Sequence, residues 1–279
     1  MTANPESPNS KTAWPFGRLL TSPFAAIGRI AISWVDNLGA SSIFLSLSLL
    51  KILHPRQLSK IVQQIYYIGA RSTMIIILVS FFTGMVLGLQ SYHALVKFGA
   101  EGALGTLVTL SLVREMGPVL TAIMIAARAG SAIAAEIGIQ RISEQIDALT
   151  TMRIDPLRYL ISPRIAASII SFPVLTVMFD LVGIFGGYVS GVLLLGANAS
   201  TYVYRVQTSM DIKDITDGLI KSVVFAVIVS TICCYQGYYT HMRGDSHGAQ
   251  AVGLSTTSAV VLSCVMILVS DYVVTSLLI

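Results

Sequence analysis

Long apolar runs alternate with short polar segments over most of the chain, and they predict five membrane-spanning helices. Crossing the hydrocarbon core of a bilayer takes about 20 apolar residues in helical form. The runs that reach this length are residues 72–92, 103–135, 165–197, 218–240 and 254–279. The first carries no charge, and the last three carry one each, at Asp180, Lys221 and Asp271. The second contains several charges, which need a separate explanation.

The chain ahead of the first predicted span divides into a polar tail and a weakly apolar segment. Residues 1–23 contain four prolines among polar residues and no apolar core with a cleavage site, so we expect a disordered tail. The apolar run 38–50 is 13 residues long, which is short for a span, and it is bounded by Asp36 and Lys51. Residues 24–60 are therefore expected to form interfacial amphipathic helices, ahead of a transmembrane domain over 61–279.

The distribution of basic residues predicts that the N-terminus lies in the cytoplasm and the C-terminus outside. With five spans, twelve Lys and Arg residues fall on the N-terminal side of the membrane and four on the other. Cytoplasmic loops are the ones that carry the excess of Lys and Arg.

The composition indicates an all-α integral membrane protein and argues against several kinds of chemistry. Apolar residues make up 54% of the chain and charged residues 11%, whereas a soluble domain usually has about 25% charged residues. The three cysteines show no C-x-x-C spacing, so neither a zinc site nor a disulfide framework is expected. The sequence has no G-x-x-x-x-G-K-[ST], H-E-x-x-H or G-x-S-x-G motif, so we expect no ATP, cofactor or metal in this chain. The net charge of +4 is modest, and we expect no nucleic-acid partner.

Small residues recur at intervals of four in three of the predicted spans. Glycines do so at positions 84 and 88 and again at 183, 187 and 191. The longest stripe consists of Ala122, Ala126, Gly130, Ala134 and Gly138. Small residues at this spacing let helix backbones approach closely in lipid. Two interpretations stay open: packing within one chain, or a contact between two copies.

Residues 138–156 interrupt the apolar pattern between the second and third predicted spans. Three- and four-residue steps place four apolar residues on one helical face: Ile139, Ile142, Ile146 and Leu149. The other faces carry Arg141, Glu144, Gln145 and Asp147. We therefore expect one short cytoplasmic helix over 139–152, ended by the proline at 156. It either lies on the lipid headgroups or docks into the groove of a partner protein.

The second predicted span contains Arg114, Glu115 and Arg128, and a charge at the centre of a bilayer costs about 2.5–3.5 kcal/mol on insertion scales. Pro118 follows closely and has no N–H, so the carbonyl of Arg114 loses its helical partner. Glu115 falls on the side of the small-residue stripe and should face protein. Arg128 lies about 21 Å further along a straight helix, near the cytoplasmic interface. It is expected to be an interfacial anchor or a partner of Glu136.

Two explanations for the first pair of charges stay open. In one, Arg114, Glu115 and Lys221 line a polar cavity for a lipid headgroup, since an arginine can give a phosphate two charge-assisted hydrogen bonds. The Gly117-Pro118 break would open this cavity. In the other, the charges pair internally, for example Glu115 with Lys221 or Arg114 with Asp271.

The stretch LVREMGPVLTAIMIAARAGSAIAAEIGIQRISEQIDALTTMRIDPLRYLISPR resembles the signature region of the MlaE/YrbE family. FTGMVLGLQSY, LIKSVVFA and the aspartate of SDYVVT match the family as well, and the similarity covers roughly residues 60–279. Members of this family are permease subunits of ABC transporters that move lipids with MCE-domain partners. The resemblance therefore implies a phospholipid permease in the bacterial inner membrane.

The resemblance also implies partners and residue roles. It implies a homodimer, an ATPase subunit that binds ATP and Mg²⁺, an MCE-domain periplasmic protein, and a small accessory protein on the ATPase. The helix 139–152 would contact the ATPase, with coupling assigned to Arg141, Glu144, Gln145 and Asp147. The residues implied to contact phospholipid are Leu87, Tyr92, Phe98, Arg114, Glu115, Lys221 and Asp271, with Leu87 and Phe98 as apolar walls of the cavity.

Two positions depart from the family pattern, and two other functions stay open. Ser258 stands where the family usually has an arginine, and Asp180 is an acid that the pattern does not predict. A secondary transporter is one alternative, although it usually shows an internal repeat. A membrane-embedded lipid-modifying enzyme is the other, although it would need a nucleophile or metal constellation that the sequence does not show. Copurification of an ATPase would separate the three functions.

Overall fold

The structure is a computed structural model that describes residues 39–51, 57–242 and 248–278. The chain divides into two units, Met1–Ile43 and Phe44–Ile279. The predicted tail 1–23 and the predicted interfacial segment up to residue 38 lie outside the described residues. The described residues form helices joined by short turns.

Five helical segments are long and apolar enough to cross a membrane, which confirms the prediction of an all-α membrane protein with five spans. They are Leu58–Val96, Glu101–Ile142, Leu157–Leu194, Ile212–Tyr238 and Ala249–Leu278. All five begin before the apolar runs do, because backbone hydrogen bonding continues through flanking polar residues that the apolar pattern excludes. The first starts at Leu58, so the predicted boundary at residue 60 falls inside it.

Short π-helical turns occur in three of the five spans. The first span consists of α2 (Leu58–Ile65), η2 (Tyr66–Ala70) and α3 (Thr73–Val96). The second consists of η3 (Glu101–Ala103), α4 (Leu104–Ser111), η4 (Leu112–Met116), α5 (Gly117–Ile125), η5 (Ala126–Gly130) and α6 (Ser131–Ile142). The third consists of η6 (Leu157–Ile161), α8 (Ser162–Tyr188) and η7 (Val189–Leu194). The fourth and fifth are the unbroken helices α10 (Ile212–Tyr238) and α11 (Ala249–Leu278).

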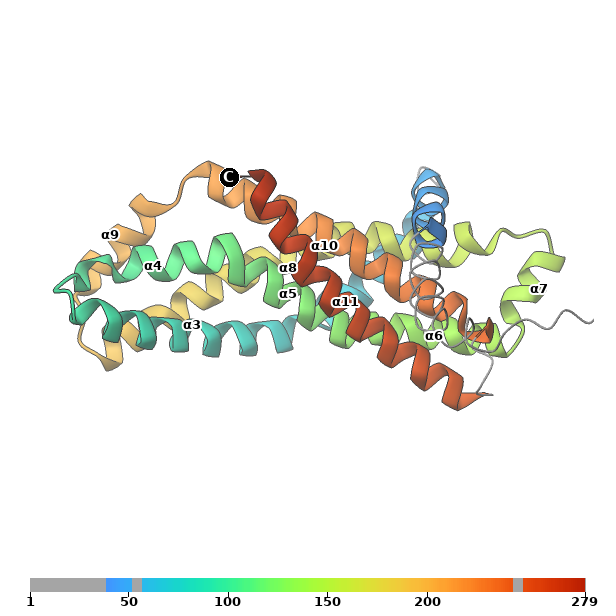
Figure 1. Cartoon of the computed structure of the whole chain (residues 1–279), viewed down its shortest axis with the longest axis horizontal. Coiled ribbons are helices and arrows are strands. Elements are labelled where there is room, and N and C mark those ends of the chain that lie inside the picture. The colour runs from blue at the N-terminus through green and yellow to red at the C-terminus, as the bar shows by residue number, and fades with distance from the viewer. Residues whose placement is uncertain (1–38, 52–56, 243–247, 279) are drawn as a thin grey trace, which may run out of the picture. The chain divides into compact units, whose positions relative to one another are not determined.

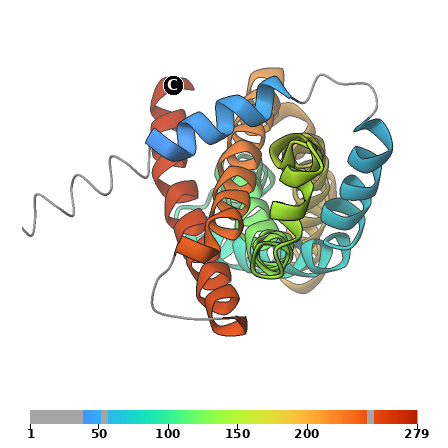
Figure 2. The ribbon, with the colours of Figure 1, turned by 90° about the vertical axis from the view of Figure 1, so that its right-hand side faces the viewer.

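Shorter helices lie outside the five spans. They are a helix over Gly39–Leu50, α7 (Gln145–Thr151), α9 (Ala199–Ser209) and the 3-10 turn η8 (Thr240–Met242). Figure 1 shows the long helices side by side, with α7 at one end of the bundle and α9 at the other. Figure 2 looks along the bundle from the end where α7 lies.

The prediction of one continuous helix over 139–152 is wrong. α6 runs on to Ile142, and Glu144 then adopts a left-handed conformation with a φ of 59°. Ile146 is buried, whereas Ile139 is 56% exposed. The four isoleucine and leucine residues therefore do not share one face, because the break turns α7 away from the direction of α6.

Close approach between helices depends on the small residues. A Cβ added to Gly84 in α3 would lie 2.7 Å from the carbonyl carbon of Gly183 in α8. A Cβ added to Gly130 would lie 2.8 Å from Sγ of Cys233 in α10. All five residues of the stripe between Ala122 and Gly138 are buried within one chain. Packing within the chain is thus confirmed, and the stripe is not available for contact with a second copy.

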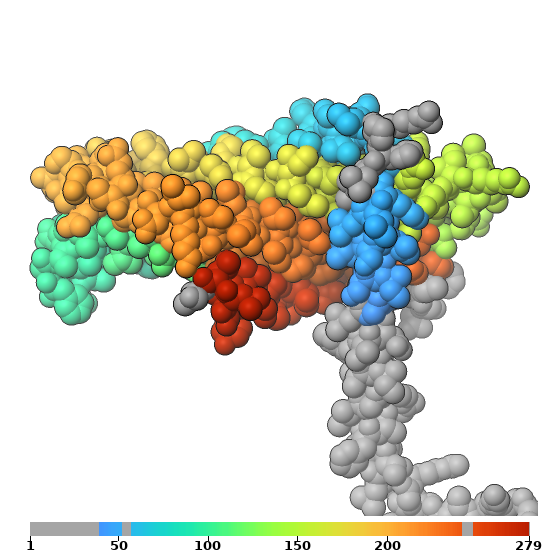
Figure 3. Space-filling model, turned by 90° about the horizontal axis from the view of Figure 1, so that it is seen from above, coloured from blue at the N-terminus to red at the C-terminus, as the bar shows by residue number. Residues whose placement is uncertain are grey.

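Helix α10 occupies a central position in the bundle. It packs against α6, α8 and α11, and Figure 3 shows it between the yellow α8 and the red α11. At the end near α7, Phe44 packs edge-on against Tyr235 with ring centroids 5.7 Å apart. The hydroxyl of Ser162 donates to the carbonyl oxygen of Ser48 at 2.9 Å. Residues 44–50 therefore rest on the ends of α8 and α10.

The α3–α8 crossing predicts that Gly84→Ala destabilises the protein. The added methyl group has no room against the Gly183 backbone, and overpacking of this kind costs about 1–3 kcal/mol. We expect a lower melting temperature for the purified protein in detergent. Gly253→Ala in α11 is the matched control, because no atom lies within 4 Å of its added Cβ. An equal melting temperature for the two variants would contradict the close crossing.

Candidate functional site

Lys221 connects three spans through its ammonium group. Its Nζ lies 2.9 Å from Oε2 of Glu115 and 3.2 Å from Oδ1 of Asp271. The same nitrogen donates a hydrogen bond to the carbonyl oxygen of Arg114 at 2.8 Å. Pro118 has no N–H to offer that carbonyl, so the lysine supplies the missing donor. The side chain of Lys221 is only 3% exposed, which makes it the buried centre of this cluster.

Arg114 pairs with Asp214, which the apolar pattern of the sequence did not predict. Its NH2 nitrogen lies 2.7 Å from Oδ1 of Asp214, whose side chain is 6% exposed. Asp214 belongs to a capping box with Asp211 at the start of α10. That capping pattern was the available signal, but it lies ahead of the apolar run that marked the predicted span. Of the two internal pairs given as examples, Glu115–Lys221 is confirmed and Arg114–Asp271 is wrong.

Glycines allow the neighbouring helices to reach the break at Pro118. A Cβ added to Gly218 in α10 would lie 2.7 Å from the carbonyl oxygen of Val113. A Cβ added to Gly117 would lie 2.9 Å from Cγ of Asp180 in α8. The Oδ1 atom of Asp180 is buried and has no hydrogen-bond partner among the described residues. The unexpected acid thus lies directly against the break.

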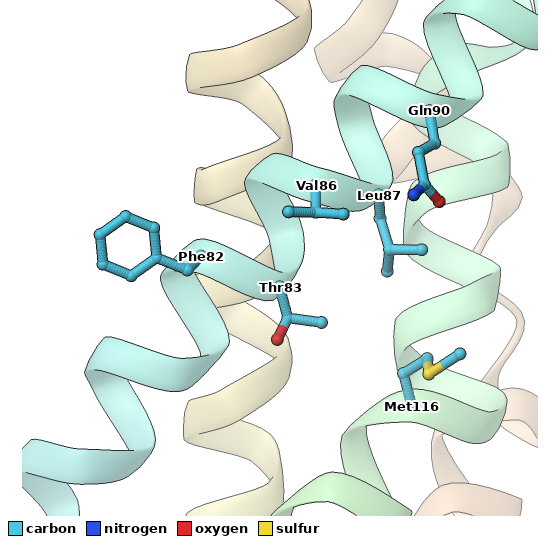
Figure 4. A pocket seen from close by; sticks show the side chains of 6 residues that line it. All are labelled: Phe82, Thr83, Val86, Leu87, Gln90 and Met116. Atoms are coloured by element: carbon cyan, nitrogen blue, oxygen red, sulfur yellow. The ribbon is translucent and has the colours of Figure 1, made fainter.

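Leu87 lines a pocket that also includes Met116, the residue after Glu115 in the chain. The pocket has a volume of about 390 Å³ and is lined by Phe82, Thr83, Val86, Leu87, Gln90 and Met116. Figure 4 shows Leu87 and Gln90 of α3 directed toward the side of the pocket formed by Met116. Arg114, Glu115 and Lys221 do not line it. The prediction of one cavity is therefore wrong: the charge cluster and the pocket are separate, and Glu115 and Met116 are their adjacent members in the chain.

The two predicted aromatic contacts lie further toward the end of α3. Tyr92 is partly buried and packs against the core. Phe98 follows the helix and is 84% exposed, and it does not line the pocket at Leu87.

Arg128 bonds to the first span, so the pairing with Glu136, one of the two roles predicted for it, is wrong. Its NH1 nitrogen donates to the carbonyl oxygen of Tyr67 at 2.8 Å and to Oγ of Ser72 at 3.2 Å. Glu136 pairs instead with NH2 of Arg164 at 2.9 Å. Arg128 therefore links the π turn η5 to the π turn η2.

The four residues expected to couple to an ATPase divide into two groups. Glu144 and Gln145 are exposed at the start of α7. Arg141 and Asp147 are joined by an ion pair of 2.6 Å. Asp147 is exposed as well, so of the four only Arg141 is turned mainly toward the rest of the chain. The described residues contain no group of three His, Cys, Asp or Glu side chains that could hold a metal ion.

Comparison with known proteins identifies the family. The family model described as Permease MlaE matches residues 61–277. The chain belongs to the MlaE permease family. The charge cluster, the pocket at Leu87 and α7 all lie within the matched region.

Several relatives of this MlaE-family chain are similar over most of its length. The intermembrane phospholipid transport system permease protein MlaE of Haemophilus influenzae is 38% identical over 262 residues, which cover 93% of this chain and 98% of that protein. A probable ABC transporter permease protein of Rickettsia prowazekii is 41% identical over 252 residues, which cover 90% and 95%. The chloroplastic protein TRIGALACTOSYLDIACYLGLYCEROL 1 of Arabidopsis thaliana is 37% identical over 214 residues, which cover 77% of this chain and 60% of the plant protein. The chain is a multi-pass membrane permease.

The cluster predicts that substitutions at its centre and edge have unequal effects. Lys221→Met leaves Glu115, Asp271 and the Arg114 carbonyl without their cation, and loss of one partner from a buried pair costs about 3–5 kcal/mol. Glu115→Gln leaves Lys221 with two partners, and the half-exposed Glu115 contributes less than about 1 kcal/mol. Thermal unfolding in detergent should therefore show a much larger loss for Lys221→Met. The reverse order would refute Lys221 as the centre of the cluster.

Proposed function

We propose that this chain is the membrane-spanning subunit of an ABC transporter that moves phospholipids between the bacterial inner membrane and an MCE-domain partner. ATP would bind with Mg²⁺ to a separate ATPase subunit and be hydrolysed there. The observation that carries this proposal is a charge cluster inside the spans in which two side chains are accessible. Arg114 is 54% exposed and Glu115 is 46% exposed, whereas Lys221 between them is buried. The name of the Haemophilus relative supports phospholipid as the substrate class.

The free donors of Arg114 suit the phosphate of a lipid headgroup. Its Nε and NH2 nitrogens both point at Oδ1 of Asp214, at 2.8 and 2.7 Å. The NH1 nitrogen has no hydrogen-bond or ion-pair partner among the described residues, so its hydrogens remain for a ligand. Asp214 holds the guanidinium plane in place, which reduces the entropy lost when a phosphate binds.

The pocket at Leu87 suits the apolar part of the same lipid. Its lining is mainly apolar, and it opens beside Met116, next to Glu115 in the chain. In the proposed arrangement the acyl chains use this apolar surface, and the headgroup contacts Arg114, two residues before Met116 in the chain. Tyr92, Phe98 and Asp271 remain proposed contacts on the strength of the family resemblance.

The proposed assembly places α7 in the cytoplasm against the ATPase. The excess of Lys and Arg on the N-terminal side supports this orientation, with the C-terminus in the periplasm. Glu144 and Gln145 are exposed there and are available to a partner. A second copy of the chain and a small accessory protein on the ATPase complete the assembly. The dimer contact would use a surface other than the buried small-residue stripe.

Photo-crosslinking tests the lipid pathway in the complete transporter. A photoreactive residue at Leu87 should capture phospholipid, and capture should change several-fold between the nucleotide-free and vanadate-trapped states. Arg114→Gln should reduce capture at Leu87, because the headgroup loses its donors. Leu181 in α8 is the matched control, since it is apolar and 65% exposed and should meet bilayer lipid equally in both states. If capture at Leu87 is the same in both nucleotide states and is not reduced by Arg114→Gln, the proposed lipid pathway is contradicted.

Charge reversal tests the docking surface. Glu144→Lys combined with Gln145→Lys should reduce the ATPase that copurifies with the permease at least tenfold, because reversed charge at an interface creates like-charge contacts. Glu101→Lys in η3, in an exposed position at the opposite end of the bundle, reverses one carboxylate as Glu144→Lys does and should leave copurification unchanged. If the double variant retains a stoichiometric ATPase, α7 is not the docking element.

A further inference from the structure

Arg141 joins α7 to the end of α10. Its side chain is only 16% exposed, and its NH1 nitrogen lies 2.6 Å from Oδ1 of Asp147 in α7. Its Nε donates to Nδ1 of His241 at 3.0 Å, just beyond α10. The guanidinium also lies over the ring of Tyr238, 5.4 Å from its centroid. One side chain thus contacts both the short helix and the residues that end the fourth span.

The helix α7 is held by few interactions of its own. It has seven residues, which is too short for a stable helix in isolation. Ser143 and Glu144 separate it from α6, and the left-handed conformation of Glu144 prevents the two helices from forming one rigid rod. The buried Ile146 and the ion pair from Asp147 to Arg141 attach α7 to the rest of the chain. A displacement of α7 by a bound protein would therefore reach Arg141 through Asp147.

The helix α10 provides the stiffer of two routes from this end to the charge cluster. Lys221 and Tyr238 are 17 residues apart in one unbroken helix, a distance of about 26 Å. The route through the second span passes the π turns η5 and η4, where the regular hydrogen-bond pattern is interrupted. A displacement at Tyr238 can thus reach Lys221 with little loss along the way.

We infer that Arg141 is a positioning residue that transmits movement of α7 to α10 and thereby to Lys221. This inference rests on the proposed function, in which α7 receives the ATPase. It assigns Arg141 a role separate from docking, because its guanidinium contacts the permease itself. Loss of Arg141 should uncouple the ATPase from lipid without releasing it.

The test uses the chain with its ATPase, purified in detergent and reconstituted in liposomes of phosphatidylethanolamine and phosphatidylglycerol. The readouts are the ATPase that copurifies and the ratio of ATP hydrolysis in liposomes to hydrolysis in detergent. Arg141→Gln and Asp147→Asn should both retain the ATPase and lower this ratio at least fivefold. Arg141→Lys keeps the charge beside Asp147 and should restore part of the ratio. Arg158→Gln is the control, since Arg158 is exposed and its guanidinium has no ion pair within the described part of the chain.

Each outcome supports or overturns the inference. An unchanged ratio for both Arg141→Gln and Asp147→Asn overturns it. Loss of the ATPase from these variants also overturns it, since Arg141 would then belong to the docking surface. Absence of any ATPase from the wild-type complex would instead refute the proposed function. Asp147 is 57% exposed, so its variant is expected to fold and to report even if Arg141→Gln does not accumulate.

Discussion

The centre of the bundle depends on the hydrogen bond that Lys221 donates to the carbonyl oxygen of Arg114, because this bond gives a partner to a backbone acceptor inside the membrane. No water is available in the hydrocarbon region, so every backbone polar group there needs a partner within the protein. Pro118 lacks the N–H that would donate to that carbonyl in a regular helix, and the ammonium group of Lys221 donates in its place. The cation in turn needs counter-charges, which Glu115 and Asp271 provide. One proline therefore leads to a contact that joins the second, fourth and fifth spans.

A second backbone irregularity is resolved in the same way near the end of the bundle where α7 lies. The π turn η2 ends at Ala70, and the carbonyl oxygen of Tyr67 within it accepts a hydrogen bond from Arg128. Arg128 itself lies in the π turn η5 of the second span. A long cationic side chain thus crosses between two irregular segments, as Lys221 crosses to η4. The unbroken helices α10 and α11 have no such turns, and they provide the regular surfaces against which the irregular spans pack.

The sequence predicts the parts of this arrangement that depend on local composition. The five spans follow from apolar length, and the freed carbonyl at Arg114 follows from Pro118 alone. The partner of Arg114 could not be predicted from the apolar pattern, because Asp214 lies ahead of the apolar run and its position depends on how α10 packs against η4. The break at Glu144 could not be predicted for another reason. Apolar spacing continues across it, and periodicity cannot show that one residue adopts a positive φ.

Internal pairing and headgroup binding, the two explanations for the intramembrane charges, are compatible because the cluster has a buried part and an exposed part. Lys221 is buried and its contacts are internal, so its charge is retained for pairing. Arg114 pairs through Nε and NH2 with the buried Asp214, while more than half of its side chain remains exposed. Pairing thus fixes the position of the exposed group and leaves donors free. A headgroup site built in this way does not require an unpaired cation in the absence of lipid, since Arg114 and Lys221 already have acidic partners within the protein.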